Sequence, residues 1–140
     1  MPLLPPISYE DASPEVRAVF DDIRATRKAD YINDVWKVLA NDPIELRRCW
    51  TQVKEVMSNG ELDPLTKELI YLAVSITNDC EYCINTHHAS ARAKGLTDGK
   101  LREMLAVVGL ASMMNKVVAG WQVPLDARYA ARLDGGSCQQ

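Results

Sequence analysis

Residues 80–87 read Cys-Glu-Tyr-Cys-Ile-Asn-Thr-His, a stretch that places two thiols and an imidazole along one helix. At about 100° per residue, positions 80, 83 and 87 fall within roughly 60° of one another on a helix. A helix N-terminus stabilises anions, so thiols in its first turn are biased toward the reactive thiolate. His87 follows Cys83 by four residues, where it can accept or return a proton. The pattern predicts a dithiol redox site.

The chain around this stretch indicates an all-helical protein. Pro and Gly lie at the edges of segments with helical apolar spacing, and no stretch shows the alternation of a strand. A short helix is expected near residues 35–40. Asn78 and Asp79 are expected to break the chain and cap the helix that follows, and Gly95 to end that helix. The other helix starts are predicted at Ser13, Asp42, Asp63 and Thr97 or Asp98.

Length, charge and cysteine usage limit the classes of function. We predict a single domain over residues 1–140, with residues 135–140 as a flexible tail. The formal charge of −3 and isoelectric point near 5.4 argue against a nucleic-acid or anionic-membrane binder, which needs a basic face. No basic segment followed by an apolar run opens the chain, so we expect a cytoplasmic protein. Without a secretion signal, a Cys-x-x-Cys pair favours catalysis or metal binding over structural disulfides, and the remaining thiols, Cys49 and Cys138, stand apart.

Residues 104–121 form the most apolar part of the sequence. The stretch from Met104 to Met114 contains Gly109 and Ser112, and we expect it to be too short to cross a bilayer. The segment is nevertheless too apolar for one small domain to cover. It is therefore expected to form part of an oligomer interface or, alternatively, a central core helix.

Four residues give the sequence a resemblance to a known family. Glu68, Cys80, Cys83 and His87 follow the pattern Glu-x11-Cys-x2-Cys-x3-His. This pattern resembles that of the alkylhydroperoxidase D-like (AhpD-like) proteins of the carboxymuconolactone decarboxylase superfamily. The resemblance covers most of the chain and implies an all-α bundle of about six to eight helices, assembled as trimers or as hexamers built of dimers.

The resemblance also implies an activity, that of a thiol peroxidase or disulfide oxidoreductase. In matching members the second cysteine attacks the peroxide, the first is proton donor and resolving thiol, and the Glu and His form a proton relay. Those roles fall on Cys83, Cys80, Glu68 and His87. A peroxide or disulfide is then the substrate and an external dithiol the reductant, with no cofactor and no metal.

One position departs from the pattern of the best-known members, which carry His immediately before the second cysteine. Tyr82 stands there in this chain. Tyr can form hydrogen bonds but is neutral near pH 7, so one proton-transfer route is missing or altered. Decarboxylases of the same superfamily generally lack the cysteine pair, which favours thiol chemistry here.

The position of Glu68 can also be argued from the residues alone. It precedes Cys80 by twelve residues, so a tight antiparallel helix pair could return its carboxylate to the cysteine helix. Burial beside apolar Leu72 and Ile76 would raise the pKa of Glu68 toward the range useful for proton transfer. The alternative is a surface Glu paired with Lys67 or Arg92.

Other interpretations of the same residues remain open. Cys80, Cys83 and His87 could form a zinc site with Glu68 or His88, although zinc usually needs four ligands. The dithiol could serve a non-catalytic redox-sensing oligomer. Glu68 and His87 could act as the acid–base pair of an enzyme for a small organic acid. Tyr71 and Tyr82 could line the access to the thiols, and core packing is favoured for Tyr71. His88 is interpreted as peripheral. The residues interpreted as packing in the core or an interface are Cys49, Trp36, Trp50 and Trp121.

Overall fold

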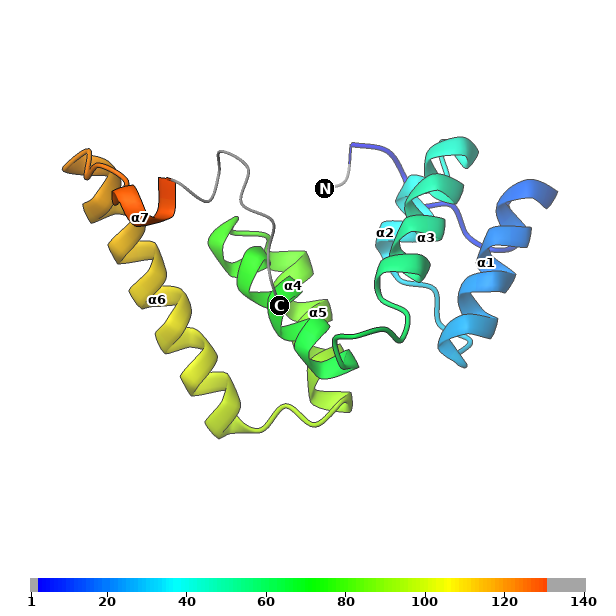
Figure 1. Cartoon of the computed structure of the whole chain (residues 1–140). Helices are drawn as coiled ribbons and strands as arrows, with labels where there is room; N and C mark the ends of the chain where they lie inside the picture. The colour runs from blue at the N-terminus through cyan, green and yellow to red at the C-terminus, as the bar shows by residue number, and fades with distance from the viewer. Residues whose placement is uncertain (1–2, 131–140) are drawn as a thin grey trace. The chain divides into compact units, whose positions relative to one another are not determined.

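The computed structural model describes residues 3–130, and within them every regular element is an α-helix (Figure 1). The all-α prediction is confirmed. The chain divides into two compact units, one up to Glu61 and one from Leu62 onward, and each is described by itself. Residues 135–140, including Cys138, lie outside the described residues. The helices are α1 (Pro14–Arg27), α2 (Asp34–Leu39), α3 (Pro43–Val56), α4 (Pro64–Thr77), α5 (Glu81–Ala93), α6 (Asp98–Gly120) and α7 (Ala127–Ala130).

The first unit packs α1, α2 and α3 around one apolar core. Its two long helices begin as predicted, because the side chains of Ser13 and Asp42 accept hydrogen bonds from backbone N–H groups of the first turn. Each cap is followed by Pro, whose missing N–H costs nothing at that position. α3 ends at Val56, four residues before Gly60, where the sequence predicted its stop. The buried core residues are Ala12, Val16, Val19, Phe20, Ile23, Ile32, Trp36, Ala40, Leu46 and Trp50.

The second unit is built on the antiparallel pair of α4 and α5 (Figure 1). Asp63 caps α4 through the N–H of Thr66, and Thr97 caps α6. Between α4 and α5 the chain reverses through Asp79, whose φ of 54° is left-handed. At the end of α5, Gly95 has a φ of 94°, a conformation that glycine adopts without a steric penalty. The first turn sets α5 antiparallel to α4, and the second leads the chain from α5 into α6.

The core of the second unit lies between α4, α5 and the start of α6. Leu72, Ala91 and Leu96 are buried there. The apolar stripe predicted for α4 contributes to this core, since Leu69 and Ile76 pack against it while half-buried. Alone among the charged side chains of the described residues, Glu68 is buried within this packing.

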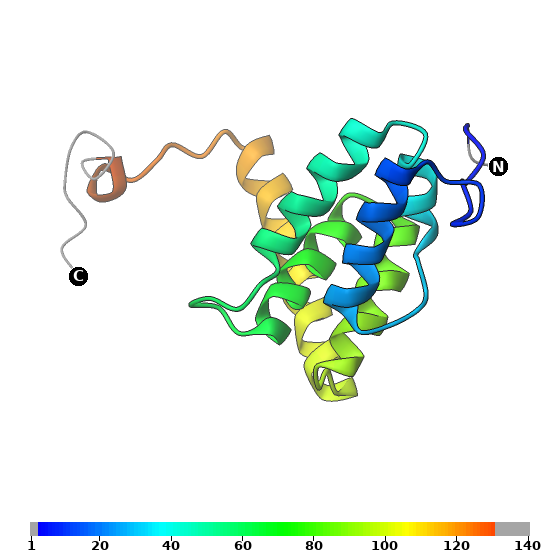
Figure 2. The same ribbon diagram turned by 90° about the vertical axis from the view of Figure 1, so that its right-hand side faces the viewer.

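The long helix α6 packs lightly on α4, and none of its residues is buried. Its alternative assignment as a central core helix is therefore wrong. The stretch from Met104 to Met114, expected to be too short to cross a bilayer, lies within this longer helix of 23 residues. An 18-residue window of α6 has a mean hydropathy of 1.3, so the whole helix is long and apolar enough to cross a bilayer. Length and composition alone are weak evidence for a membrane span. Figure 2 shows the extended connection that follows α6 and leads to α7.

The first unit predicts a contrast between two isoleucines. Ile23 is fully buried in α1, whereas Ile44 at the start of α3 is 77% exposed. We expect Ile23→Ala to lower the free energy of unfolding of this unit by about 2–5 kcal/mol, because it removes buried methylenes and leaves a cavity. Ile44→Ala should change it by less than about 0.5 kcal/mol. Urea unfolding followed by tryptophan fluorescence measures both, and equal effects would contradict the assigned core.

Candidate functional site

The two cysteines lie at the N-terminus of α5. Cys80 is itself the N-cap residue, and its Sγ accepts a hydrogen bond of 3.3 Å from the N–H of Cys83. The cap is therefore Cys80 rather than the predicted Asn78 or Asp79. The structure joins Cys80 and Cys83 in a disulfide with Cα atoms 5.3 Å apart, and both residues are half-buried. The dithiol thus occupies the helix terminus at which a thiolate is stabilised.

Glu68 reaches from α4 to α5 and accepts three hydrogen bonds there. Nδ1 of His87 lies 2.7 Å from its Oε2 atom. The hydroxyl of Ser90 donates to Oε1 at 2.7 Å, and the ammonium of Lys94 donates to the same oxygen at 2.6 Å. The Glu68 residue is only 4% exposed, so the predicted return of the carboxylate to the cysteine helix is confirmed. The alternative of a surface glutamate is wrong, and Arg92 pairs with Asp98 instead.

The pKa of Glu68 differs from the sequence prediction. Burial does raise the pKa of this carboxyl, as predicted. The hydrogen bonds from His87, Lys94 and Ser90 together outweigh that effect and lower the pKa of Glu68 to about 2. The predicted rise is therefore wrong, because hydrogen-bond donors as well as apolar side chains surround this carboxyl. At neutral pH Glu68 is a carboxylate and an acceptor only.

His87 is held on two sides. Because the Glu68 carboxylate can only accept, Nδ1 of His87 must carry the proton of their hydrogen bond. Tyr71 of α4 stacks on the imidazole, with ring centroids 3.5 Å apart and an interplanar angle of 18°. Tyr71 is 39% exposed, so its prediction as a core residue is wrong. The hydrogen bond and the stack fix the ring and leave Nε2 as the nitrogen for proton exchange.

The structure brings the predicted site residues together in two pairs. One pair is the disulfide of Cys80 and Cys83, and the other is Glu68 with His87. Among residues 3–130, no hydrogen bond joins His87 to either sulfur in this oxidised form. The two pairs meet on α5, where Cys83 and His87 are four residues, about one helical turn, apart.

Two residues of the site were missed by sequence reasoning. Ser90 and Lys94 both hold Glu68, and neither belongs to the cysteine motif. A signal was present in the spacing, because residues 80, 83, 87, 90 and 94 alternate steps of three and four and so share one face of a helix. Polar or reactive side chains at every position of such a face indicate a buried polar seam.

The other candidates lie apart from this site. His88 is peripheral, as predicted, and accepts a hydrogen bond from Arg92. Cys49 is a partly buried free thiol that packs against the core of the first unit, as predicted. Trp36 and Trp50 belong to that core, whereas Trp121 is 81% exposed.

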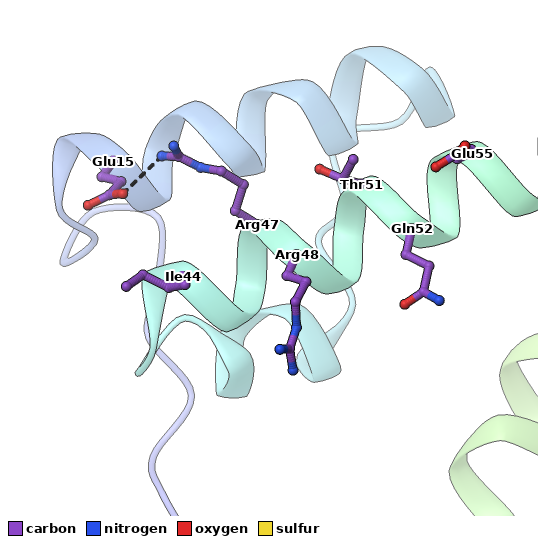
Figure 3. Close-up of a pocket in the computed structure, with 7 residues that line it drawn as sticks. All are labelled: Glu15, Ile44, Arg47, Arg48, Thr51, Gln52 and Glu55. Atoms are coloured by element: carbon purple, nitrogen blue, oxygen red, sulfur yellow. Dashed lines mark hydrogen bonds and ion pairs between the residues drawn. The ribbon is translucent and has the colours of Figure 1, made fainter.

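The described part of the chain contains an open groove but no metal-binding cluster. Among residues 3–130, no group of three or more His, Cys, Asp and Glu side chains is arranged to hold a metal ion. An open groove of about 500 Å³ lies between α1 and α3 (Figure 3). Its arginine Arg47 is already paired with Glu15, and none of the predicted site residues lines it. The predicted site residues lie instead on α4 and α5 and at the turn between them.

The Glu68 cluster predicts how stability depends on pH. A carboxyl whose pKa is lowered by folding stabilises the protein above its unfolded pKa and loses that stabilisation as pH falls through the folded pKa. With Glu68 near 2 when folded and an ordinary value of 4.5, the loss should fall between about pH 5 and pH 2 and amount to about 3 kcal/mol. Glu68→Gln should remove this part of the pH dependence in urea unfolding, whereas Glu61→Gln, at an exposed position, should leave it. A Glu68→Gln profile parallel to that of the parent protein would contradict the buried anion.

Comparison with known proteins identifies the family to which the chain belongs. The model of the carboxymuconolactone decarboxylase family matches residues 45–126, more than half of the chain. The crystal structure of the alkylhydroperoxidase AhpD core from Rhodospirillum rubrum is similar, with a TM-score of 0.89 and 50% identity over 93% of this chain and 98% of that one. The "Uncharacterized protein 4 in cox locus" of Paracoccus denitrificans is 39% identical over 54 residues, 39% of this chain, and the match spans about half (49%) of that relative. The chain therefore belongs to the carboxymuconolactone decarboxylase family and has the AhpD-like fold.

Proposed function

We propose that this protein is a thiol-dependent peroxidase or disulfide oxidoreductase that works through Cys80 and Cys83. Membership of the family supports a peroxidase-like or a decarboxylase-type role. The observation that favours the first is the cysteine pair at the start of α5, on the same helix as the His87 that Glu68 holds. Such a helix start stabilises a thiolate, and a fixed imidazole supplies a proton acceptor beside it.

The proposed reaction has two oxidative steps. The Cys83 thiolate attacks one peroxide oxygen, the O–O bond breaks, and the second oxygen leaves as an alcohol or water after taking a proton. Cys83 is then a sulfenic acid, and its sulfur has lost two electrons. Cys80 attacks that sulfur, the S–S bond forms, and the oxygen leaves as water. The Cα separation of 5.3 Å suits this disulfide.

The cycle is completed by an external dithiol. Its thiolate attacks the Cys80–Cys83 disulfide and forms a mixed disulfide with one cysteine. The second thiol of the reductant then attacks this mixed disulfide, releases the cysteine and leaves the reductant as a disulfide. Two electrons return to the protein and both cysteines are again thiols. A reductant of this kind fits the cytoplasmic location that we propose for the protein.

Proton transfer in this proposal belongs to His87. With a pKa near 2, Glu68 does not exchange protons near neutral pH, so it acts as a fixed anion that orients and stabilises the imidazole. The free Nε2 of His87 takes the proton of a thiol and returns it to the departing oxygen. Tyr82, which is 44% exposed, is not assigned a proton-transfer role.

A second candidate is an enzyme for a small organic acid, which the matched family supports by its name. Glu68 and His87 would then act without the thiols. The double variant Cys80→Ser/Cys83→Ser distinguishes the two, because turnover of such an acid should survive it and peroxide consumption should not.

The thiol mechanism predicts the effect of removing Cys83. We expect Cys83→Ser to reduce peroxide consumption with a dithiol reductant at least a hundredfold, because a serine hydroxyl is not ionised near pH 7 and is not oxidised by peroxide. Cys49→Ser, which removes a thiol of the first unit, should keep the parent rate. Equal rates for the parent and Cys83→Ser would remove Cys83 from the mechanism.

We also propose that the protein is a homo-oligomer, a trimer or a hexamer, in which a second copy covers α6. Its exposed apolar side chains include Val107, Leu110 and Met113, each more than half exposed. Apolar surface of this extent on a soluble protein is typical of an interface. No nucleic acid or membrane is part of the proposal.

The proposed assembly predicts that one charged substitution in α6 lowers the mass of the protein in solution. The parent should have a solution mass three or six times the 15.6 kDa of one chain by light scattering. Leu110→Lys should reduce that mass, because it places a charge in a desolvated contact. Ile44→Lys, in the first unit, should leave it unchanged. A parent protein of 15.6 kDa would contradict the assembly.

A further inference from the structure

Lys94 contacts the Glu68 cluster without belonging to the cysteine motif. Its Nζ lies 2.6 Å from Oε1 of Glu68 and 2.7 Å from the hydroxyl of Ser90, which itself donates to Oε1. The ammonium of Lys94, the hydroxyl of Ser90 and Oε1 of Glu68 are therefore each within hydrogen-bond distance of the other two. The other oxygen, Oε2, is left to His87.

The charges at this site must be balanced because Glu68 is buried. An ionised carboxylate that is 4% exposed needs a cationic partner or strong hydrogen bonds to stay ionised. The described groups in contact with it are His87, Ser90 and Lys94. Ser90 is neutral and His87 is a cation only when protonated, so Lys94 is the permanent cation of the cluster.

Lys94 supplies this charge from a partly exposed position at the end of α5. It stands at the C-cap of α5, where a cation also interacts favourably with the helix dipole. The side chain is 36% exposed, so its ammonium reaches inward to Glu68 while remaining partly hydrated.

We infer that Lys94 is a positioning residue that balances the charge of Glu68 and thereby lets His87 be neutral in the working site. Without that ammonium, the buried carboxylate would be compensated only by a protonated His87. A protonated imidazole cannot accept the proton of a thiol. Lys94 therefore sets the pH range over which His87 can act as a base, and it does so through Glu68 without touching the thiols.

The groups that face His87 come from α4 and α5. From α4 they are Glu68 and the stacked ring of Tyr71, and on α5 itself Lys94 acts through Glu68. From α6, no charged side chain of the described residues contacts Glu68 or His87. Lys94 is thus the cation whose removal changes the balance.

The test is the titration of the His87 ring by NMR. The chain has only two histidines, so His88→Gln assigns their signals. We expect the ring of His87 to stay protonated to a pH at least one unit higher in Lys94→Met than in the parent. Lys94→Gln, which keeps a hydrogen-bond donor but no charge, should move in the same direction. Lys94→Arg and the control Lys100→Met, at an exposed position in the first turn of α6, should titrate like the parent.

The inference rests on the proposed function, and the two can fail separately. A titration of His87 that is the same in Lys94→Met and Lys94→Gln as in the parent would overturn the role of Lys94, whatever the activity. If His87 responds as expected, peroxide consumption by Lys94→Met should reach half its maximal rate at a pH higher by a similar amount, with an unchanged KM for peroxide. A shifted ring titration in a protein that consumes no peroxide would support Lys94 and remove the proposed function. A side chain that merely clamped α4 to α5 would alter stability and leave both pH profiles in place.

Discussion

The site depends on one buried carboxylate. Glu68 lies in the seam between α4 and α5, where an uncompensated charge would be strongly destabilising. Three donors from one face of α5 make its ionised form the stable one. The same contacts hold the two helices in register. The packing of the two helices and the charge of Glu68 therefore depend on the same contacts.

The consequence for the chemistry is a division of roles along α5. Its N-terminus carries the sulfurs, where the helix dipole favours a thiolate. One turn later His87 is fixed by Glu68 and Tyr71, and at the C-terminal end Lys94 provides the balancing charge. A carboxylate that stays ionised near neutral pH can orient a neighbouring group, so in the proposed mechanism the imidazole carries the protons.

Much of the fold was predictable because its determinants are local. Ser13, Asp42 and Asp63 cap the N–H groups of the turn that follows them, and the next residue is Pro in each case, so the helix starts could be assigned from four or five residues at a time. The meeting of Glu68 with His87 was predicted from the family pattern. By itself, the twelve-residue spacing from Glu68 to Cys80 allowed a surface position as well.

The parts that sequence reasoning missed depend on how charges and surfaces are shared in space. The direction of the Glu68 pKa was wrong because Ser90 and Lys94 lie outside the motif, and their donors outweigh burial. Cys80 was expected after a capping residue, yet the left-handed Asp79 turns the chain so that the thiol caps the helix itself. For α6, apolarity predicted a covered surface, but the pattern does not say whether the same chain or another copy covers it.

The most direct test of the central claim is the ionisation of Glu68 as the dithiol changes its redox state. Infrared spectra of the oxidised and of the reduced protein at neutral pH, each minus the corresponding spectrum of Glu68→Gln, report a protonated Glu68 carboxyl group by its C=O stretch. We expect no such band from Glu68 in either state, because the carboxylate stays ionised throughout. A band that appears on reduction and is absent from Glu68→Gln would show that Glu68 takes up a proton, and would contradict its assignment as a permanent anion.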